Sequence, residues 1–485
     1  MNHQQKNVLT RPWFLYLLPL FFVLHVLAEN YGAHLGETAL IVFIQYTVVA
    51  IVFSFLFQFF YKDKLKANLF AFALLAFNFF FGSLHDALKK QFDSSFITKY
   101  SVLIPAVVVL FIAQFLYLKK TKQSFFKTAR FLNLLFLLFI FIDLVTIAFR
   151  AINMSHAATD ISSQFTMPVA NKPDVYLIVA DEYAGKQELK DIFSFENSSF
   201  ENELGKRGFY VLQNTRSNYN TTVYSISSLF NMDYLKGIHS TISQREMFIC
   251  RGIINQNNTT GFFKNNGYSI YNHSFFELGG KEQAVFIPFF IRKKDLFTSQ
   301  TFARRIRTDL AFNIASQQQV KKIELDNTGK NQKLDSLLRR TVLEKTSRPK
   351  FVYTHFFMPH YPYYADSNGK NISLKEMKPS EDKAAYLNYL VYVIMKLLQL
   401  ADYIKANSSL PPIIIIISDH GFRSLSEQED QKYYFMNLDA VYFPDQNYSQ
   451  FYDGMSLVNQ FRVILNSEFG QKLPLLKDSS IFLRE

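Results

Sequence analysis

Five long apolar runs occupy the first 150 residues of this 485-residue chain. Most of them approach the roughly 20 residues that an α-helix needs to cross a bilayer, and the third is the shortest. No run ends in a small-residue cleavage site after a short apolar core, so we expect an uncleaved transmembrane helical domain over residues 1–152. The runs are Trp13–Ala28, Thr38–Phe60, Leu69–Gly82, Tyr100–Leu118 and Phe131–Phe149.

The distribution of Lys and Arg predicts how this domain is oriented, because cytoplasmic loops carry an excess of these residues. Basic clusters precede the first run, follow the second and follow the fourth, whereas no Lys or Arg lies between the first and second runs. Residues 1–152 hold 14 Lys and Arg against 6 Asp and Glu, a net charge of +8 out of the chain's +12. We therefore assign the basic excess to a multi-pass domain of the inner or plasma membrane, and expect a lipid bilayer and no nucleic acid as its partner. With five spans and a cytoplasmic N-terminus, the chain after Arg150 is expected on the extracytoplasmic side.

The remainder of the chain has the pattern of an α/β domain. Residues 153–173 lack sustained periodicity and are expected to form a linker, and residues 174–485 are expected to form one extracytoplasmic domain. Short apolar runs alternate there with longer and more charged stretches, which predicts a mainly parallel central sheet with helices on both faces. The only cysteine, Cys250, is expected to be buried as a small apolar side chain. The expected strands are Val175–Ala180, Phe209–Leu212, Tyr268–Tyr271, Phe351–Phe357 and Ile413–Ile417.

Two of the expected strands end on side chains that can bind a metal. Asp181 and Glu182 follow the first strand, and Asp419 and His420 follow the run of five isoleucines. Ligands of open α/β sheets bind at the carboxyl ends of the strands, so both pairs are expected to lie at one edge. Either pair alone would be explained by a capped strand end or a surface ion pair. Together they predict one divalent cation, with Zn²⁺ or Mn²⁺ best matched by mixed oxygen and imidazole ligands and Mg²⁺ or Ca²⁺ as alternatives.

A nucleophile and further histidines are available from three other segments. Thr221 or Thr222 precedes an amphipathic run, where the N-terminus of a helix favours an anion, although a threonine there is usually only a cap. His360 follows the fourth expected strand and is a better candidate for the site than His355, which lies within that strand. His273, just after the third strand, could reach a leaving group, but a surface role fits its position better.

The segments "VYLIVADEYAG", "MPHYPYY" and "IIIISDHGFR", with a threonine before a helix, resemble the sulfatase-like branch of the alkaline phosphatase superfamily. Five spans before such a domain are similar to lipoteichoic acid synthases and phosphoethanolamine transferases, in which a threonine attacks a phospholipid head group. The resemblance covers residues 174 to about 423 and the membrane architecture. It implies an alkaline-phosphatase-like fold and an integral membrane, metal-dependent enzyme of the cell envelope that acts on lipid head groups or envelope glycans.

Site residues follow from the resemblance position by position. Asp181, Glu182, Asp419 and His420 match the metal ligands, and Thr222 matches the nucleophile when Leu229 is set on the leucine of the sulfatase motif, with Thr221 as the adjacent alternative. His360, together with Arg423, is expected to neutralise charge on the transferred group. The Pro and Arg that sulfatases need to form their aldehyde are absent, and threonine cannot give it, so phosphoryl chemistry is favoured over sulfate ester hydrolysis. No histidine follows His420, which implies one metal rather than two.

Three functions stay open at this point: a head-group phosphotransferase, a phosphodiesterase or sulfatase-type hydrolase, and a catalytically degenerate protein of envelope assembly. Asp143, inside the fifth run, is a functional candidate by default, although pairing with Gln45, Asn78 or Gln114 would explain it equally well. Basic clusters at 292–294, 304–307 and 321–322 suit either anionic head groups or solvated helix faces. The sequence does not predict the donor, the acceptor or the oligomeric state.

Overall fold

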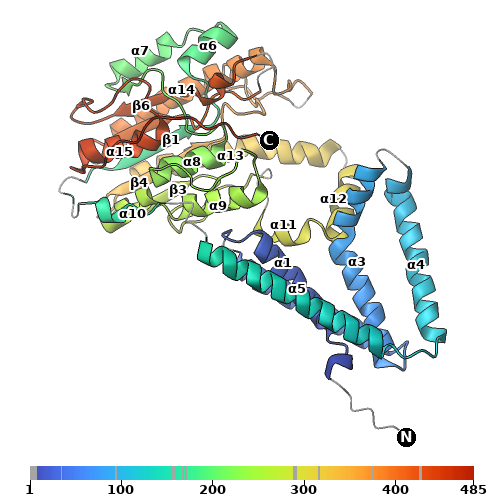
Figure 1. The fold of residues 1–485 in the computed structure, drawn as a ribbon. Helices are drawn as coiled ribbons and strands as arrows, with labels where there is room; N and C mark the ends of the chain where they lie inside the picture. Colours follow the sequence, from blue (N-terminus) through green and yellow to red (C-terminus); the bar gives the residue numbers. More distant parts are fainter. Residues whose placement is uncertain are drawn as a thin grey trace. The chain divides into compact units, whose positions relative to one another are not determined.

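The computed structural model describes residues 8–33, 35–92, 96–153, 159–166, 169, 172–287, 292–314, 317–373, 375–424 and 429–484. The chain forms two compact units (Figure 1). The helical unit contains Met1–Met154 and Pro288–Ser316, and the sheet unit contains Ser155–Ile287 and Gln317–Glu485. An all-helical region therefore precedes an α/β domain, as the sequence predicts.

Five helices of the helical unit correspond to the five apolar runs. The third is 28 residues long, twice the apolar run from which it was expected, because polar residues continue the helix at both ends. Its start is capped by Asp63, whose side chain accepts a hydrogen bond from Leu65 N at 2.7 Å. The helices are α1 (Phe14–Glu29), α2 (Gly36–Gln58), α3 (Lys64–Gln91), α4 (Tyr100–Lys120) and α5 (Phe126–Asn153), with short 3₁₀ turns at Val8–Thr10 and Phe96–Thr98.

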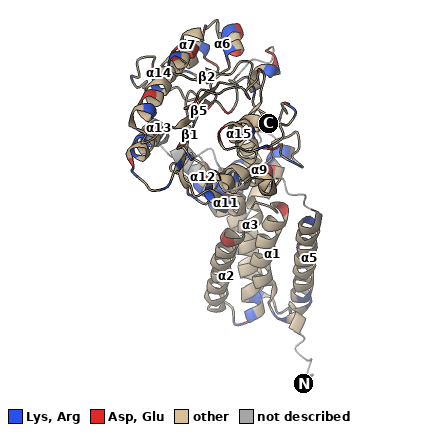
Figure 2. Cartoon of the chain, turned by 90° about the vertical axis from the view of Figure 1, so that its left-hand side faces the viewer, with Lys and Arg blue, Asp and Glu red and all other residues tan. Residues whose placement is uncertain are grey.

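Among the described residues, five helices are long and apolar enough to cross a membrane: α2, α3, α4, α5 and α14 (Lys383–Asn407). The 16-residue α1 is shorter but equally apolar, and Figure 2 shows few charges along these first helices. α14 belongs to the sheet unit and buries Tyr386, Leu390, Leu397 and Ile404 along one face. We therefore interpret α14 as a packed helix of that unit and α1–α5 as the five predicted spans.

One segment far along the chain joins the helical unit. α11 (Lys293–Thr298) and α12 (Phe302–Ile314) lie between two parts of the sheet unit in sequence, yet they cluster with α1–α5. Phe302 packs with its ring centroid 4.9 Å from those of Phe77 and Phe81 on α3, and Gly82 N donates to Gln300 O at 2.7 Å. The sequence analysis placed this segment in the extracytoplasmic domain, because charge and length did not reveal its contacts with α3.

The sheet unit is built on six strands in the order β2-β6-β5-β1-β4-β3. β1 pairs in parallel with β4 and β5, and β3 in parallel with β4, whereas β6 is antiparallel to β5 and β2. The mainly parallel sheet is thus confirmed, and all five expected strands are present. β6 was not predicted, because four residues beginning with an aspartate give little strand signal. The strands are β1 (Val175–Ala180), β2 (Tyr210–Val211), β3 (Ser269–His273), β4 (Lys350–Phe356), β5 (Ile413–Ile417) and β6 (Asp439–Tyr442).

Helices cover both faces of this sheet, since every residue of β1, β4 and β5 is buried. On one face Phe230 of α8, Phe263 of α10 and Phe461 of α15 bring their rings against Phe351 of β4. In Figure 2 the strands lie between α15 on one side and α13 and α14 on the other. Cys250 of α9 is buried, as predicted. The remaining helices are α6 (Lys186–Phe193), α7 (Ser198–Lys206), α8 (Thr222–Asn231), α9 (Gln244–Asn255), α10 (Asn258–Asn265), α13 (Gln317–Leu343) and α15 (Leu457–Glu468).

Candidate metal-dependent active site

The two central strands, β1 and β5, deliver the pairs Asp181–Glu182 and Asp419–His420 to one edge of the sheet. β1 and β5 are parallel neighbours, so the residues after Ala180 and Ile417 leave the sheet side by side. Asp181, Asp419 and His420 are all buried, and each offers one ligand atom that lies within 4.8 Å of the other two. The approach that the sequence predicted for these three residues is therefore present.

In the described part of the chain, no Lys or Arg forms an ion pair with either carboxylate of the cluster. Asp181 Oδ1 and Asp419 Oδ2 are buried and have no hydrogen-bond partner among the described residues. His420 Nε2 lies 3.9 Å from Asp181 Oδ1 and 3.3 Å from Asp419 Oδ2. Burial, and next the charge of Asp419, raise the pKa of Asp181 well above its ordinary value. Two orphaned carboxylate oxygens beside an imidazole nitrogen are a donor set that suits a divalent cation.

The hydrogen bonds of His420 fix the direction of its lone pair. Its Nδ1 lies 2.8 Å from Gly421 O, a carbonyl that can only accept, so Nδ1 carries the proton and Nε2 the lone pair. Burial lowers the pKa of His420 to about 3, which keeps the ring neutral. The Nε2 lone pair is therefore available to a metal or to a hydroxyl donor, and Thr222 Oγ1 lies 3.1 Å away from it.

Thr222 is the first residue of α8, a helix whose residues are all buried. Ser225, one turn on, donates its hydroxyl to Asp419 O at 2.6 Å, which ties the first turn of α8 to the end of β5. Thr221 is the N-cap residue, and its side chain does not cap the helix and has no hydrogen-bond partner in the described part of the chain. The structure thus places Thr222, rather than Thr221, in contact with the buried cluster.

Glu182 is not a member of this group of three. It has a left-handed φ of 63°, a conformation that is strained for a residue with a side chain. Its backbone N–H donates to Asp419 Oδ1 at 3.1 Å, while its carboxylate accepts from Arg423 N at 2.8 Å. Of the four predicted metal ligands, three lie close enough together to hold one ion: Asp181, Asp419 and His420. The role of Glu182 as a ligand stays a prediction.

His360 and Arg423 lie on either side of the Glu182 carboxylate. His360 Nε2 is 3.7 Å and Arg423 Nε is 3.9 Å from its oxygens. Their side chains are 21% and 23% exposed, whereas His420 is fully buried. The two residues expected to bind an anion are therefore more exposed than His420.

The two remaining histidines do not lie where the sequence favoured them. His355, the weaker candidate, is buried beside the cluster, with Nε2 3.6 Å from Asp181 Oδ2 and Nδ1 2.6 Å from the hydroxyl of Tyr353. Burial lowers the pKa of His355 to about 4. His273 is also buried rather than on the surface, and its Nε2 lies 2.9 Å from Thr341 Oγ1. No contact in the described part of the chain joins His273 to the cluster.

Side chains that the sequence analysis did not select hold the turn after β1 and the turn after β5 in place. Tyr386 donates its hydroxyl to Glu182 O and accepts from Ala184 N, both at 2.9 Å. Glu188 Oε2 accepts from Phe422 N at 3.3 Å, and a Cβ on Gly421 would lie 2.1 Å from Tyr433 O. The only sequence signal for these positions was the glycine after His420, which marks a close approach of backbone.

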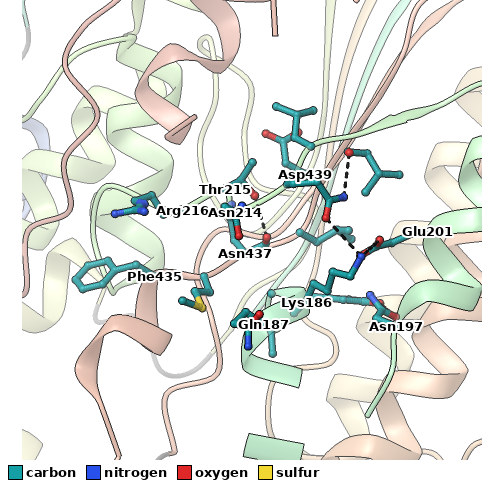
Figure 3. A pocket seen from close by; sticks show the side chains of 18 of the residues that line it. Lys186, Gln187, Asn197, Glu201, Asn214, Thr215, Arg216, Phe435, Asn437 and Asp439 are labelled. Atoms are coloured by element: carbon teal, nitrogen blue, oxygen red, sulfur yellow. Dashed lines mark hydrogen bonds and ion pairs between the residues drawn. The ribbon is translucent and has the colours of Figure 1, made fainter. Parts of the chain in front are cut away.

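A cavity of about 470 Å³ lies at the same edge of the sheet, beside the predicted site (Figure 3). It is lined by residues 183–187 after Glu182, by residues 211–216 and by residues 435–439, and none of the predicted site residues lines it. Asn437 joins its wall to the end of β5 by donating to Ser418 O at 2.8 Å. On the opposite side Lys186 pairs with Glu201 at 2.6 Å, as the dashed line in Figure 3 shows.

Comparison with known proteins gives structural neighbours only. No family model and no curated protein matches the chain. The zinc complex of the C-terminal periplasmic domain of EcEptC from Escherichia coli is 14% identical, with a TM-score of 0.41 over 67% of this chain and 92% of that one. The C-terminal periplasmic domain of the phosphoethanolamine transferase EptC from Campylobacter jejuni is 14% identical, with a TM-score of 0.38 over 65% of this chain and 95% of that one. A phosphonate monoester hydrolase from Silicibacter pomeroyi is 10% identical, with a TM-score of 0.40 over 64% of this chain and 75% of that one.

Proposed function

We propose that the sheet unit is a metal-dependent phosphoryl-group transferase that acts through Thr222. The observation that carries the proposal is the 3.1 Å approach of Thr222 Oγ1 to His420 Nε2, a nitrogen that lies 3.3 Å from Asp419 Oδ2 and 3.9 Å from Asp181 Oδ1. A hydroxyl needs either a base or a Lewis acid to become a nucleophile at neutral pH. The single Nε2 lone pair of His420 would be the base when no cation is bound, and a cation held by that nitrogen and the carboxylates would be the Lewis acid. Structural packing alone gives no reason to bury these groups together, because unpaired carboxylates are costly to bury.

Asp181, Asp419 and His420 would hold the cation, with Glu182 as the predicted fourth ligand. A bound divalent metal lowers the pKa of a neighbouring hydroxyl and polarises a phosphoryl oxygen. The residues of the chain supply the orientation. The Nδ1–H bond of His420 to Gly421 O aims Nε2 at Thr222, and Ser225 holds the first turn of α8 on the end of β5.

The reaction proceeds in two displacements. Thr222 Oγ1 gives up its proton to solvent and attacks phosphorus, the bond from phosphorus to the leaving oxygen breaks, and that oxygen takes up a proton from solvent. An acceptor hydroxyl then attacks the phospho-threonine, which restores Thr222. His360 and Arg423, whose side chains are partly exposed, would neutralise charge on the equatorial oxygens, and the N-terminus of α8 favours the same anion.

Membrane lipids are the substrate class that suits the rest of the chain. The sheet unit is covalently joined to helices with the length and composition of membrane spans, so its substrates are met in two dimensions at a bilayer surface. We propose an extracytoplasmic location for the site, a lipid head group as donor, and a lipid or envelope glycan as acceptor. The residue that resembles the nucleophile of phosphoethanolamine transferases is the one that contacts His420.

Peptide mass spectrometry of the covalent intermediate tests the proposal. Trypsin should release Ser217–Lys236 as one peptide, since no Lys or Arg lies within it. Protein purified from membranes and incubated with lipid extract should carry an adduct on Thr222, whose mass gives the transferred group. Thr222→Ala should lose the adduct and Thr221→Ala should keep it. An unmodified peptide in wild-type protein, together with release of free product to water without an acceptor, would identify a hydrolase instead.

A further inference from the structure

An apolar cavity of about 440 Å³ lies within the helical unit, between α2, α3 and α4. Its walls include Val49 and Phe53 of α2, Phe77 of α3, and Val107 and Phe111 of α4. The volume falls within the roughly 300–1,000 Å³ of pockets that hold small molecules. The cavity is thus large enough for a small molecule. Its walls are mainly aliphatic and aromatic, so a hydrocarbon is the ligand that suits them best.

The outer faces of these helices are also suited to contact with hydrocarbon. α2 and α4 expose large apolar side chains on the faces outside the cavity, among them Leu40 at 59%, Val109 at 64% and Leu110 at 67%. Such surfaces are stable in the acyl region of a bilayer, where lipid tails are as apolar as leucine. Water would find almost no polar partners in the cavity, and an empty cavity would lose the dispersion contacts of its walls. An acyl chain supplies those contacts.

Basic residues follow directly in the chain after the part of α12 that lines the cavity. Phe302 and Ala303 of α12 line the cavity beside Asn78, whose side-chain oxygen accepts from Ala303 N at 3.2 Å. The described part of the α11–α12 segment, residues 292–314, carries six Lys and Arg against two Asp. Figure 2 shows this concentration of basic residues on α11 and α12, next to one end of α3. A cationic rim next to an apolar cavity matches a phosphate joined to an acyl chain.

Acidic neighbours neutralise only part of this charge. Arg305 pairs with Asp86 of α3, and Arg304 pairs with Asp295 at 3.0 Å. Arg307 is exposed and lies three positions after Arg304, so the two share a face of α12. A solvated helix face would account for the charge alone, but not for the insertion of Phe302 of the same helix among Phe77 and Phe81.

We propose that the helical unit binds a membrane phospholipid, with an acyl chain in the cavity between α2, α3 and α4 and its phosphate at Arg304 and Arg307. The bound lipid is held by the α11–α12 segment, which the contact of Gly82 with Gln300 fixes on α3. The site involves the helical unit alone and does not require the chemistry of Thr222.

Photolabelling of the full-length protein tests the acyl-chain part of the site. The probe is a phosphatidylglycerol with a diazirine in one acyl chain, reconstituted with the protein in phosphatidylcholine vesicles. Labelling of wild-type protein should concentrate on the cavity-facing residues of α2, α3 and α4. Val107→Trp on α4 and Val49→Trp on α2 fill the cavity and should each lose this labelling, while Val109→Trp on the outer face of α4 should keep it. Equal labelling in all four proteins, or labels spread over every apolar helix face, would overturn the proposal.

A second arm tests the phosphate. The double variant Arg304→Gln, Arg307→Gln should lose labelling by the phosphatidylglycerol probe and keep labelling by a diacylglycerol probe with the same chain. Lys119→Gln with Lys120→Gln, at the other end of α4 and about 30 Å from Tyr100 at 1.5 Å per residue, should leave both unchanged. Equal labelling of wild-type protein by the two probes would show that the head group is not recognised. Thr222→Ala should be labelled as strongly as the wild-type protein. Loss of lipid binding by the helical unit can therefore be distinguished from loss of the proposed enzyme activity.

Discussion

The hydroxyl oxygen of Thr222 lies 3.1 Å from Nε2 of His420, although the two residues are 198 positions apart and come from different elements. Thr222 begins α8, and His420 follows β5. Nδ1 of His420 donates its hydrogen to Gly421 O, so the lone pair of the ring is on Nε2. This nitrogen lies near both the threonine hydroxyl and the two carboxylates. A single side chain thereby links the proposed nucleophile to the proposed metal site.

Substitution of Thr222 should separate nucleophilic from structural effects. We expect Thr222→Ala to lower transfer by at least on the order of 10³-fold, since removal of a nucleophile removes the reaction path itself. Thr222→Ser keeps the hydroxyl and should retain measurable activity. Activity is measured as transfer of a labelled lipid head group, with the melting temperature as a check on folding. Thr221→Ala is the matched control, and a loss of activity as large as that of Thr222→Ala would assign the nucleophile to the neighbouring residue.

The buried carboxylates should make the protein dependent on a cation. We expect about one divalent metal per chain, and removal by a chelator should lower the melting temperature because the metal binds only the folded state. Asp419→Asn should abolish this metal binding. Without metal, however, Asp419→Asn should be at least as stable as the metal-free wild type, because it removes one of two facing charges. Elemental analysis and thermal unfolding measure these effects, with Asp453→Asn, an exposed position, as control. Full metal content in Asp419→Asn would contradict the assignment.

The turn after His420 should not tolerate a methyl group. A Cβ at Gly421 would lie 2.1 Å from Tyr433 O and 2.7 Å from Glu188 Oε2. Gly421→Ala should therefore cost about 1–3 kcal/mol of stability and displace His420 from Thr222, with loss of activity. Gly261→Ala is the matched control: it lies in α10 with no atom within 4 Å of the added Cβ, and should stabilise the helix by up to about 1 kcal/mol. Equal stability of the two variants in urea unfolding would show that the turn can relax.

Much of the site was predictable, because its main signal is local. A strand that is buried on both faces must be apolar throughout, so polar residues directly after it mark the ligand-binding edge. Asp181 and Asp419 were found in this way. The direction of Glu182 could not be found, since its left-handed φ turns the carboxylate toward Arg423 N, and a sequence does not reveal such strain.

The contacts that were not predicted depend on packing between distant segments. His355 was the weaker of two candidates because it lies within a strand, yet the register of β4 against β1 places Val179 opposite it and brings its ring beside Asp181. The pairing of Asp143 was left open between three residues, and the structure pairs it with a fourth, His25, at 3.1 Å. The α11–α12 segment is a further case, because only its contacts with Phe77 and Gly82 show which unit it joins.

A second buried aspartate should give the sheet unit a characteristic dependence of stability on pH. Asp439 begins β6, is 1% exposed, and one of its oxygens has no hydrogen-bond partner among the described residues. Burial raises the pKa of Asp439 well above its ordinary value, while a hydrogen bond from Gln460 Nε2 at 3.0 Å opposes this shift. The folded state therefore keeps the carboxyl proton at a pH where the unfolded chain has lost it.

The sign of the effect follows from proton linkage. Above about pH 4, the ordinary pKa of an aspartate, the unfolded state binds fewer protons than the folded one, so stability falls by up to about 1.4 kcal/mol per pH unit until the folded-state pKa is reached. Asp439→Asn cannot titrate and can still accept from Gln460. The difference in unfolding free energy, wild type minus Asp439→Asn, should decrease steadily as the pH rises above about 4. Urea unfolding followed by near-ultraviolet circular dichroism measures it, with the exposed substitution Asp453→Asn expected within about 0.5 kcal/mol of wild type at each pH. A difference that does not vary with pH would mean that Asp439 is ionised in the folded protein and must have a cationic partner.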